Sequence, residues 1–169
     1  NCGKSAIGLR QASFDCSHIG INTVTLYAQD ISGNIDSCTW NVSVIESLPR
    51  TAACKDSCSS VASDGNNTID SSYIDDGSQD NCGISALGLS QASFDCSHIG
   101  INTVTLYAQD ISGNIDSCTS NVTVIDSLPP TAACKDTSVY LDATGNYTID
   151  SSYIDDGSQD NCGISALGL

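Results

Sequence analysis

The chain has 169 residues, and its 20 acidic residues against five basic ones give a net charge of −15. A charge of this sign and size repels phosphate backbones and anionic lipid headgroups, so nucleic acid and membrane surfaces are excluded as favourable partners. The sequence has no apolar run of about 18 residues, and we therefore expect no membrane insertion in this segment.

The sequence repeats itself with a period of 80 residues. Residues 11–39 are identical to residues 91–119, and residues 68–83 return unchanged as residues 148–163. Enzymes seldom need tandem copies of one active site, whereas stalks, filaments and multivalent binders gain length or avidity from each copy. The repeat therefore favours a non-catalytic role.

Proline marks the joints between the copies. Residues 124–131 contain two prolines, which end a strand and stiffen a linker. In the corresponding residues 44–51, Arg50 stands in place of Pro130, which predicts a looser joint. The sequence thus predicts the C-terminal part of a first module in residues 1–48, a complete module in residues 49–128 and the N-terminal part of a third in residues 129–169.

Strand signals follow one another at short intervals in the complete module. Residues 102–109 alternate, with Val104, Leu106 and Ala108 on one face, as a half-buried strand does. Residues 110–114 form a tight turn, and residues 115–125 form the returning strand of a hairpin. The other expected strands are residues 51–56, 68–74, 82–89 and 93–96, with an acidic loop at residues 75–81. Seven or so short strands predict an all-β, immunoglobulin-like β-sandwich, with an up-and-down barrel as the alternative.

Ten cysteines are present, and four positions recur from copy to copy. Four cysteines in a small domain without a Cys-x-x-Cys zinc spacing indicate two disulfides and an oxidising compartment. If residues 82–89 and 93–96 form a hairpin, Cys82 lies opposite Cys96. The full set of expected pairs is Cys82–Cys96, Cys2–Cys16 and Cys54–Cys118. Cys38, Cys134 and Cys162 are then expected to find partners outside this segment, and Cys58, which aligns with Ser138, to be a free thiol or to bond another chain.

The succession Pro-Thr-Ala-Ala-Cys, Asp-Asn-Cys-Gly, Gly-x-Asn-Thr-Val-Thr, Ala-Gln-Asp-Ile-Ser-Gly-Asn and Val-Thr-Val-Ile-Asp resembles the hyalin repeat, or HYR domain. The resemblance spans the whole module. It implies an immunoglobulin-like extracellular module that is used in tandem for adhesion. Near-identical acidic copies with this signature are most similar to the giant repetitive surface adhesins of gliding bacteria, the SprB-like adhesins.

Acidic side chains gather at two places that the predicted fold brings to each joint. Calcium takes six to eight oxygen ligands and tolerates irregular geometry, so a calcium ion is one interpretation, although no cofactor is required by the sequence. The other interpretation is that these residues make turns and keep a long polymer soluble. The candidate ligands are Glu46, Asp75, Asp76, Asp80, Asp110 and Asn114 at the first joint, and Asp126, Asp155, Asp156 and Asp160 at the second.

Other polar residues carry weaker signals. His18 and His98 follow a cysteine in a loop without an identifiable nucleophile, and we interpret both as solvent-exposed loop residues. Trp40 replaces Ser120 at a core parity, which predicts a buried tryptophan and a slightly underfilled core at Ser120. The candidate glycosylation sites are Asn41, Asn66, Asn121 and Asn146 in Asn-x-Ser/Thr triplets and Ser127 in an Asp-Ser-Leu triplet.

Three hypotheses for function follow. The first is a structural and adhesive repeat of a long cell-surface filament, in which further copies of the repeat are the neighbours and domains outside this segment contact surface glycans or a substratum. The second is a carbohydrate-binding module repeated for avidity, and the third is an accessory domain of a secreted enzyme. Because Asn1 is neither an initiator methionine nor the start of a signal peptide, we expect an export signal and an anchor outside this segment.

Overall fold

The computed structural model describes residues 4–48 and 50–168, which form two compact units. The first unit combines the described part of Asn1–Thr51 with Ser78–Ala86 and Ala108–Asp116. The second unit contains Ala52–Gly77, Leu87–Tyr107 and the described part of Ser117–Leu169. The two units interleave along the sequence, so the module boundaries drawn from the repeat stay predictions.

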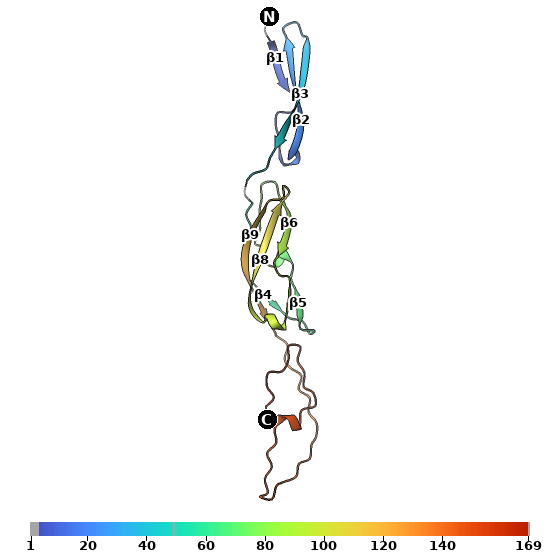
Figure 1. The fold of residues 1–169 in the computed structure, drawn as a ribbon, viewed down its shortest axis with the longest axis vertical. Helices are drawn as coiled ribbons and strands as arrows, with labels where there is room; N and C mark the ends of the chain where they lie inside the picture. The colour runs from blue at the N-terminus through green and yellow to red at the C-terminus, as the bar shows by residue number, and fades with distance from the viewer. Residues whose placement is uncertain (1–3, 49, 169) are drawn as a thin grey trace. The chain divides into compact units, whose positions relative to one another are not determined.

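The N-terminal part of the chain forms an antiparallel sheet in the order β1-β2-β3 (Figure 1). Its strands are β1 (Lys4–Leu9), β2 (Gly20–Asp30) and β3 (Ile35–Val44), with a 3-10 turn at Cys16–His18. The β2–β3 turn forms because Asp30 Oδ1 accepts hydrogen bonds from the amides of Ser32 and Asn34 at 2.9 and 2.8 Å. Gly33 has φ +89°, a value that L side chains rarely adopt.

The complete module has two layers. One is a four-stranded sheet in the order β4-β9-β8-β6, in which β4 runs parallel to β9, and the other is the antiparallel pair β5-β7 (Figure 1). The strands are β4 (Ser57–Ser60), β5 (Asn66–Thr68), β6 (Ile84–Leu89), β7 (Ser93–Asp95), β8 (Gly100–Asp110) and β9 (Ile115–Ile125), with 3-10 turns at Ser71–Tyr73 and Cys96–His98. The predicted fold class, an all-β immunoglobulin-like sandwich, is confirmed.

Two predicted strands are shorter than the sequence suggested. Residues 51–56 make only isolated bridges, Thr51 to Gln79 and Cys54 to Asp75. The strand expected over residues 68–74 ends at Thr68, because the carboxylate of Asp70 accepts the amide of Ser72 at 2.8 Å and begins a 3-10 turn. The described part of residues 129–169 repeats both bridges and the turn, at Ser151–Tyr153, and contains no strand.

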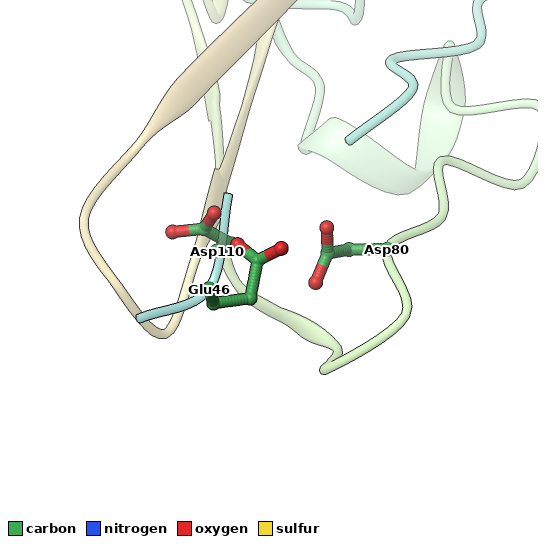
Figure 2. Close-up of side chains that lie close together, drawn as sticks. All are labelled: Glu46, Asp80 and Asp110. Atoms are coloured by element: carbon green, nitrogen blue, oxygen red, sulfur yellow. The ribbon is translucent and has the colours of Figure 1, made fainter. Parts of the chain in front are cut away.

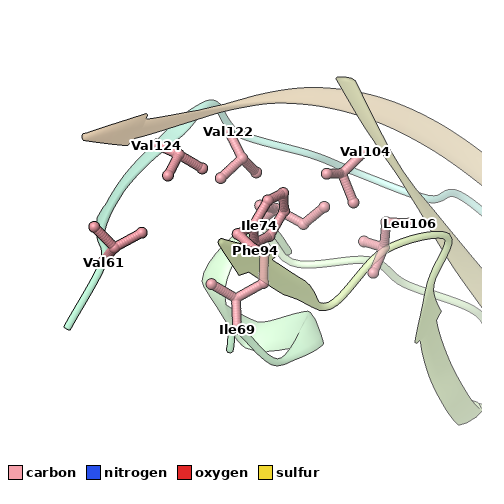
Figure 3. Close-up of a cluster of buried hydrophobic side chains, with 8 residues drawn as sticks. All are labelled: Val61, Ile69, Ile74, Phe94, Val104, Leu106, Val122 and Val124. Atoms are coloured by element: carbon pink, nitrogen blue, oxygen red, sulfur yellow. The ribbon is translucent and has the colours of Figure 1, made fainter. Parts of the chain in front are cut away.

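The core of the complete module is a small apolar cluster between its two layers (Figure 3). Val104 and Leu106 from β8 and Val122 and Val124 from β9 are fully buried, as their alternation predicts. Phe94 from β7 packs against them from the other layer. The remaining members of the cluster are Val61, Ile69 and Ile74. Each Å² of apolar surface removed from water contributes about 25 cal/mol to the free energy of folding. This cluster is therefore the main non-covalent source of stability for the module.

Trp40 and Ser120 occupy equivalent positions of the repeat, and the structure places their side chains differently from the prediction. Ser120 is buried, but its hydroxyl donates a 2.6 Å hydrogen bond to the carbonyl of Lys55, so a polar contact occupies this place in the core. Trp40 is 78% exposed, and the prediction that it is buried is wrong. In the complete module, Val61 and Ile74 belong to the cluster that covers the corresponding face of β9. Among the described residues, none covers the face of β3 that carries Trp40.

Within the described residues three disulfides are present: Cys16–Cys82, Cys54–Cys118 and Cys96–Cys162. Cys54–Cys118 is the pair that the sequence predicts. The predicted Cys82–Cys96 bond is wrong, and so is Cys2–Cys16, because Cys16 bonds Cys82; Cys2 itself lies outside the described residues. Cys162, expected to need an outside partner, finds Cys96 within the chain. Two of the three disulfides therefore join neighbouring copies of the repeat.

The predicted pairing failed because β6 and β7 do not form a hairpin. β6 lies beside β8 in the four-stranded sheet, whereas β7 pairs with β5. Cys96 then begins a 3-10 turn that places its sulfur 3.4 Å from the carbonyl oxygen of Asn161, next to Cys162. Cys38, Cys58 and Cys134 are free and exposed in the described part of the chain.

No described helix is long and apolar enough to cross a membrane.

The cross-copy pairing can be checked by digestion with trypsin without reduction. Trypsin cuts after Lys55 and Lys135 and separates residues 56–135, which carry Cys96, from residues 136–169, which carry Cys162. We expect these two peptides to stay covalently joined until a reductant is added, as should residues 11–50 and 56–135 through Cys16–Cys82. Mass spectrometry of the non-reduced digest provides the measurement, and a free 136–169 peptide would contradict the pairing.

Candidate functional site: an acidic joint

Three carboxylates meet in the first unit. Glu46 follows β3, Asp80 lies in the loop before β6 and Asp110 ends β8. Each residue offers an oxygen, and these three oxygens lie within 4.8 Å of one another. Figure 2 shows Glu46 reaching toward Asp80 and Asp110 from its own segment of chain. Together with Arg50 we call this group the acidic joint, since Glu46 and Arg50 come from the linker and the other two residues from the complete module.

Local turns fix each carboxylate in place. Asp110 accepts the amides of Ser112 and Asn114 on Oδ1 at 2.9 and 2.8 Å, and the Asn114 side-chain amide on Oδ2 at 2.7 Å. Glu46 Oε1 accepts the amide of Leu48 at 2.6 Å, and Asp80 Oδ2 accepts the amide of Cys82 at 2.9 Å. The turns predicted from sequence therefore do exist, and they use only part of the acceptor capacity of these side chains.

The remaining oxygens are buried without a hydrogen-bond partner. Glu46 Oε2 and Asp80 Oδ1 are both in this condition. Burial of an ionised carboxylate oxygen costs free energy unless a donor or a cation compensates it. Arg50 supplies one positive charge, with Nε at 3.7 Å from Oδ2 of Asp110 and a side chain only 12% exposed. The joint holds three carboxylates and one guanidinium, so it has an excess of negative charge that suits a hard cation.

The pKa of Asp110 reflects this environment. Burial of the side chain acts to raise its pKa, but the hydrogen bonds from Asn114, the charge of Arg50 and the amide of Ser112 outweigh burial and lower the pKa below its usual value of 3.8. Asp110 is therefore held in its ionised form, as a turn-maker or a cation ligand requires.

The second joint repeats part of this arrangement in the second unit. Asp160 accepts the amide of Cys162 at 2.9 Å and leaves Oδ1 buried and unpartnered, as Asp80 does. Asp126, which aligns with Glu46, accepts the amide of Leu128 at 3.1 Å and the side-chain amide of Asn161 at 3.3 Å. Within residues 4–48 and 50–168, Glu46, Asp80 and Asp110 are the only three carboxylates that gather in this way.

Several predicted ligands lie elsewhere. The backbone of Asp75 and Asp76 contacts Cys54 and Ala53, and the equivalent Asp155 accepts the amide and hydroxyl of Ser158 at 3.0 and 2.6 Å, as a turn residue. Asp156 likewise bonds Ala133 through its backbone amide. Asn114 acts as a donor to Asp110. Sequence reasoning missed Arg50 as a member of the site, although its exchange for Pro130 was a visible signal.

The loop histidines take part in local caps. His98 Nδ1 lies 2.8 Å from the carboxylate of Asp95 and 3.4 Å from the hydroxyl of Ser97. Both contacts converge on one ring nitrogen, whereas a catalytic triad uses the two nitrogens separately. Ser97 and then His98 lower the pKa of Asp95 through hydrogen bonds. His18, with Asp15 and Ser17, repeats this network. The candidate glycosylation residues are all exposed, and their modification stays a prediction.

These observations define an all-β, disulfide-bonded repeat module whose polar residues mainly build turns and one acidic joint. Residues 46–124 match the family model described as the HYR domain. The chain is also similar to hyalin of Strongylocentrotus purpuratus, with 28% identity over 159 residues that cover 90% of this chain and 13% of hyalin. Both comparisons support the resemblance to the hyalin repeat that the sequence motifs indicate.

Replacement of Asp110 by Asn tests the electrostatics of the joint. Because the folded pKa is lowered, ionised Asp110 stabilises the fold above the usual pKa of 3.8, and this contribution is lost as the pH falls through the folded pKa. We expect Asp110→Asn to make the loss of unfolding free energy below about pH 4 less steep. Urea unfolding from pH 6 to pH 2.5 measures it. Asp136→Asn, at an exposed position, controls for net charge, and equal slopes in both variants would refute the assignment.

Proposed function

We propose that this chain is a non-catalytic structural and adhesive repeat of a long extracellular cell-surface filament. The observation that carries the proposal is the match of residues 46–124 to the HYR domain inside an 80-residue repeat. The similarity to hyalin and the three disulfides, which need an oxidising compartment, support it. The finer form of the proposal is a gliding-motility adhesin with repeats that provide reach, while other domains contact the glycan or substratum.

The physical properties of the module suit this role. The net charge of the chain, −15, favours solubility of long arrays and opposes lateral association at low ionic strength. The complete module has its own small core, so in an array of complete copies stability would grow with the number of copies. Asp95, Ser97 and His98 form the cap of a 3-10 turn, and the proposed role requires no chemical reaction at these residues.

Immunogold electron microscopy of intact cells tests the proposal. Antibodies raised against this chain should label the outside of non-permeabilised cells, with gold particles in rows that extend away from the surface. Fab fragments of the same antibodies should slow gliding if the finer proposal holds. Labelling that appears only after permeabilisation would refute the surface role, and strong binding of the isolated chain on a glycan array would favour the carbohydrate-binding alternative.

We also propose that the acidic joint binds calcium. The two buried, unpartnered oxygens of Glu46 and Asp80 fit a hard cation, and Asp110 adds a third carboxylate within reach. A bound ion would link the linker to the loops of the following module. The same chemistry would be weaker at the second joint of this chain, where only Asp126 and Asp160 hold corresponding positions.

Millimolar calcium should raise the melting temperature of the chain, because a ligand of the native state stabilises it by mass action. Magnesium should do less, since it dehydrates reluctantly and demands a strict octahedron. The double variant Glu46→Gln/Asp80→Asn should lose the calcium effect, whereas Asp36→Asn/Asp136→Asn, with the same change in charge, should keep it. Calorimetry that shows neither heat nor a shift would leave turn formation and solubility as the roles of these residues.

A further inference from the structure

The spacing of the disulfides is matched to the period of the repeat. Cys16–Cys82 and Cys96–Cys162 each span 66 positions of the 80-residue period. Consecutive bonds of this series are therefore separated by the short segment from Cys82 to Cys96, which is 14 positions long. The disulfides and these short segments together form a continuous covalent path along the chain.

This path is much shorter than the polypeptide itself. Tension applied to the ends of a cross-linked chain is carried, once the fold gives way, by the shortest covalent route. Between Cys16 and Cys162 the polypeptide has 146 steps, whereas the route through the two disulfides uses 14. Residues 17–81 and 97–161 form loops that lie off the route and cannot be pulled straight while the disulfides are intact.

We propose that the disulfides between copies form a covalent bypass that carries tension along the array and makes it nearly inextensible. The inference rests on the proposed function only for the claim that the array is under load; the bypass itself is a property of this chain. Its consequence is a filament whose modules can lose their folded structure under force without a large gain in length.

The core lies almost entirely off the bypass. Of the eight residues in the buried cluster, only Phe94 belongs to the segment from Cys82 to Cys96. The other seven come from the two shielded loops, which Cys54–Cys118 also joins to each other. After an overload, these loops remain tethered near one another, and the low entropy of closed loops favours their refolding.

Cys54–Cys118 begins a second route of the same kind. It spans 64 positions, and Cys118 is followed 16 positions later by Cys134, which aligns with Cys54. Cys38 aligns with Cys118 in the same way. In an array with more copies in this register, Cys38 and Cys134 take partners in the adjoining copies, and two covalent routes run in parallel.

Single-molecule pulling on the oxidised chain, held by peptide tags at its two ends, tests the bypass. The shortest covalent route from end to end contains 36 peptide steps and two disulfides. At about 3.6 Å per step the oxidised chain should extend to no more than about 140 Å, and the chain in reductant to about 600 Å. Extension of the oxidised chain to near its full length would overturn the proposal.

Two double variants with the same number of cysteines removed give the matched comparison. Cys16→Ser/Cys82→Ser opens the route, and the maximum extension should rise to about 300 Å, because the next shortest path runs through Cys54–Cys118. Cys54→Ser/Cys118→Ser leaves the route intact, and the maximum extension should stay at about 140 Å. Full extension does not depend on how well either variant folds, and tryptic mapping verifies the remaining bonds. Equal extension of the two variants would refute the bypass and leave the surface role untouched.

Discussion

Covalent cross-linking is the constraint on which the rest of this structure depends. A module of about 80 residues buries a smaller fraction of its surface than a larger domain does, and here the cluster of buried apolar residues has eight members. A disulfide that closes a loop of more than 60 residues contributes about 4 kcal/mol on chain-entropy reasoning, which is comparable to the net stability of a small domain. The strands can therefore remain short and the connections long.

Because two of the three disulfides join neighbouring copies, a single copy of the repeat is not an independent covalent unit. The repeat places the module boundaries at the prolines, but Cys16–Cys82 and Cys96–Cys162 cross these boundaries. The acidic joint crosses the first boundary as well, because Glu46 precedes the complete module, whereas Arg50, Asp80 and Asp110 belong to it. Two disulfides and the acidic joint thus lie where one copy meets the next, and the hydrophobic core lies inside the complete module.

The sequence predicted those features that depend on local patterns. The alternation of Val104, Leu106, Val122 and Val124 identified β8 and β9 and their buried faces. Side chains of a strand point to opposite faces in turn, so the apolar positions show which face is buried. The sequence predicted Cys54–Cys118 but not the partners of Cys82 and Cys96, because alternation does not tell which sheet a strand joins, and β7 pairs with β5 instead of β6. Arg50 was missed for a similar reason, since its neighbour Asp110 is distant in sequence.

The hydrogen bond from Ser120 to the carbonyl of Lys55 has a consequence for folding fidelity. Residues 11–39 and 91–119 are identical, so two hairpins of one chain compete for the same partner segment as the chain collapses. The competitors differ at the next residue, where one has Ser120 and the other has Trp40. Only the serine hydroxyl fills the small buried space beside Lys55 and satisfies its carbonyl. β3 and β9 differ at two aligned positions, Trp40/Ser120 and Ser43/Thr123, and we expect Ser120 to favour the correct neighbour over its duplicate, which disfavours domain swapping.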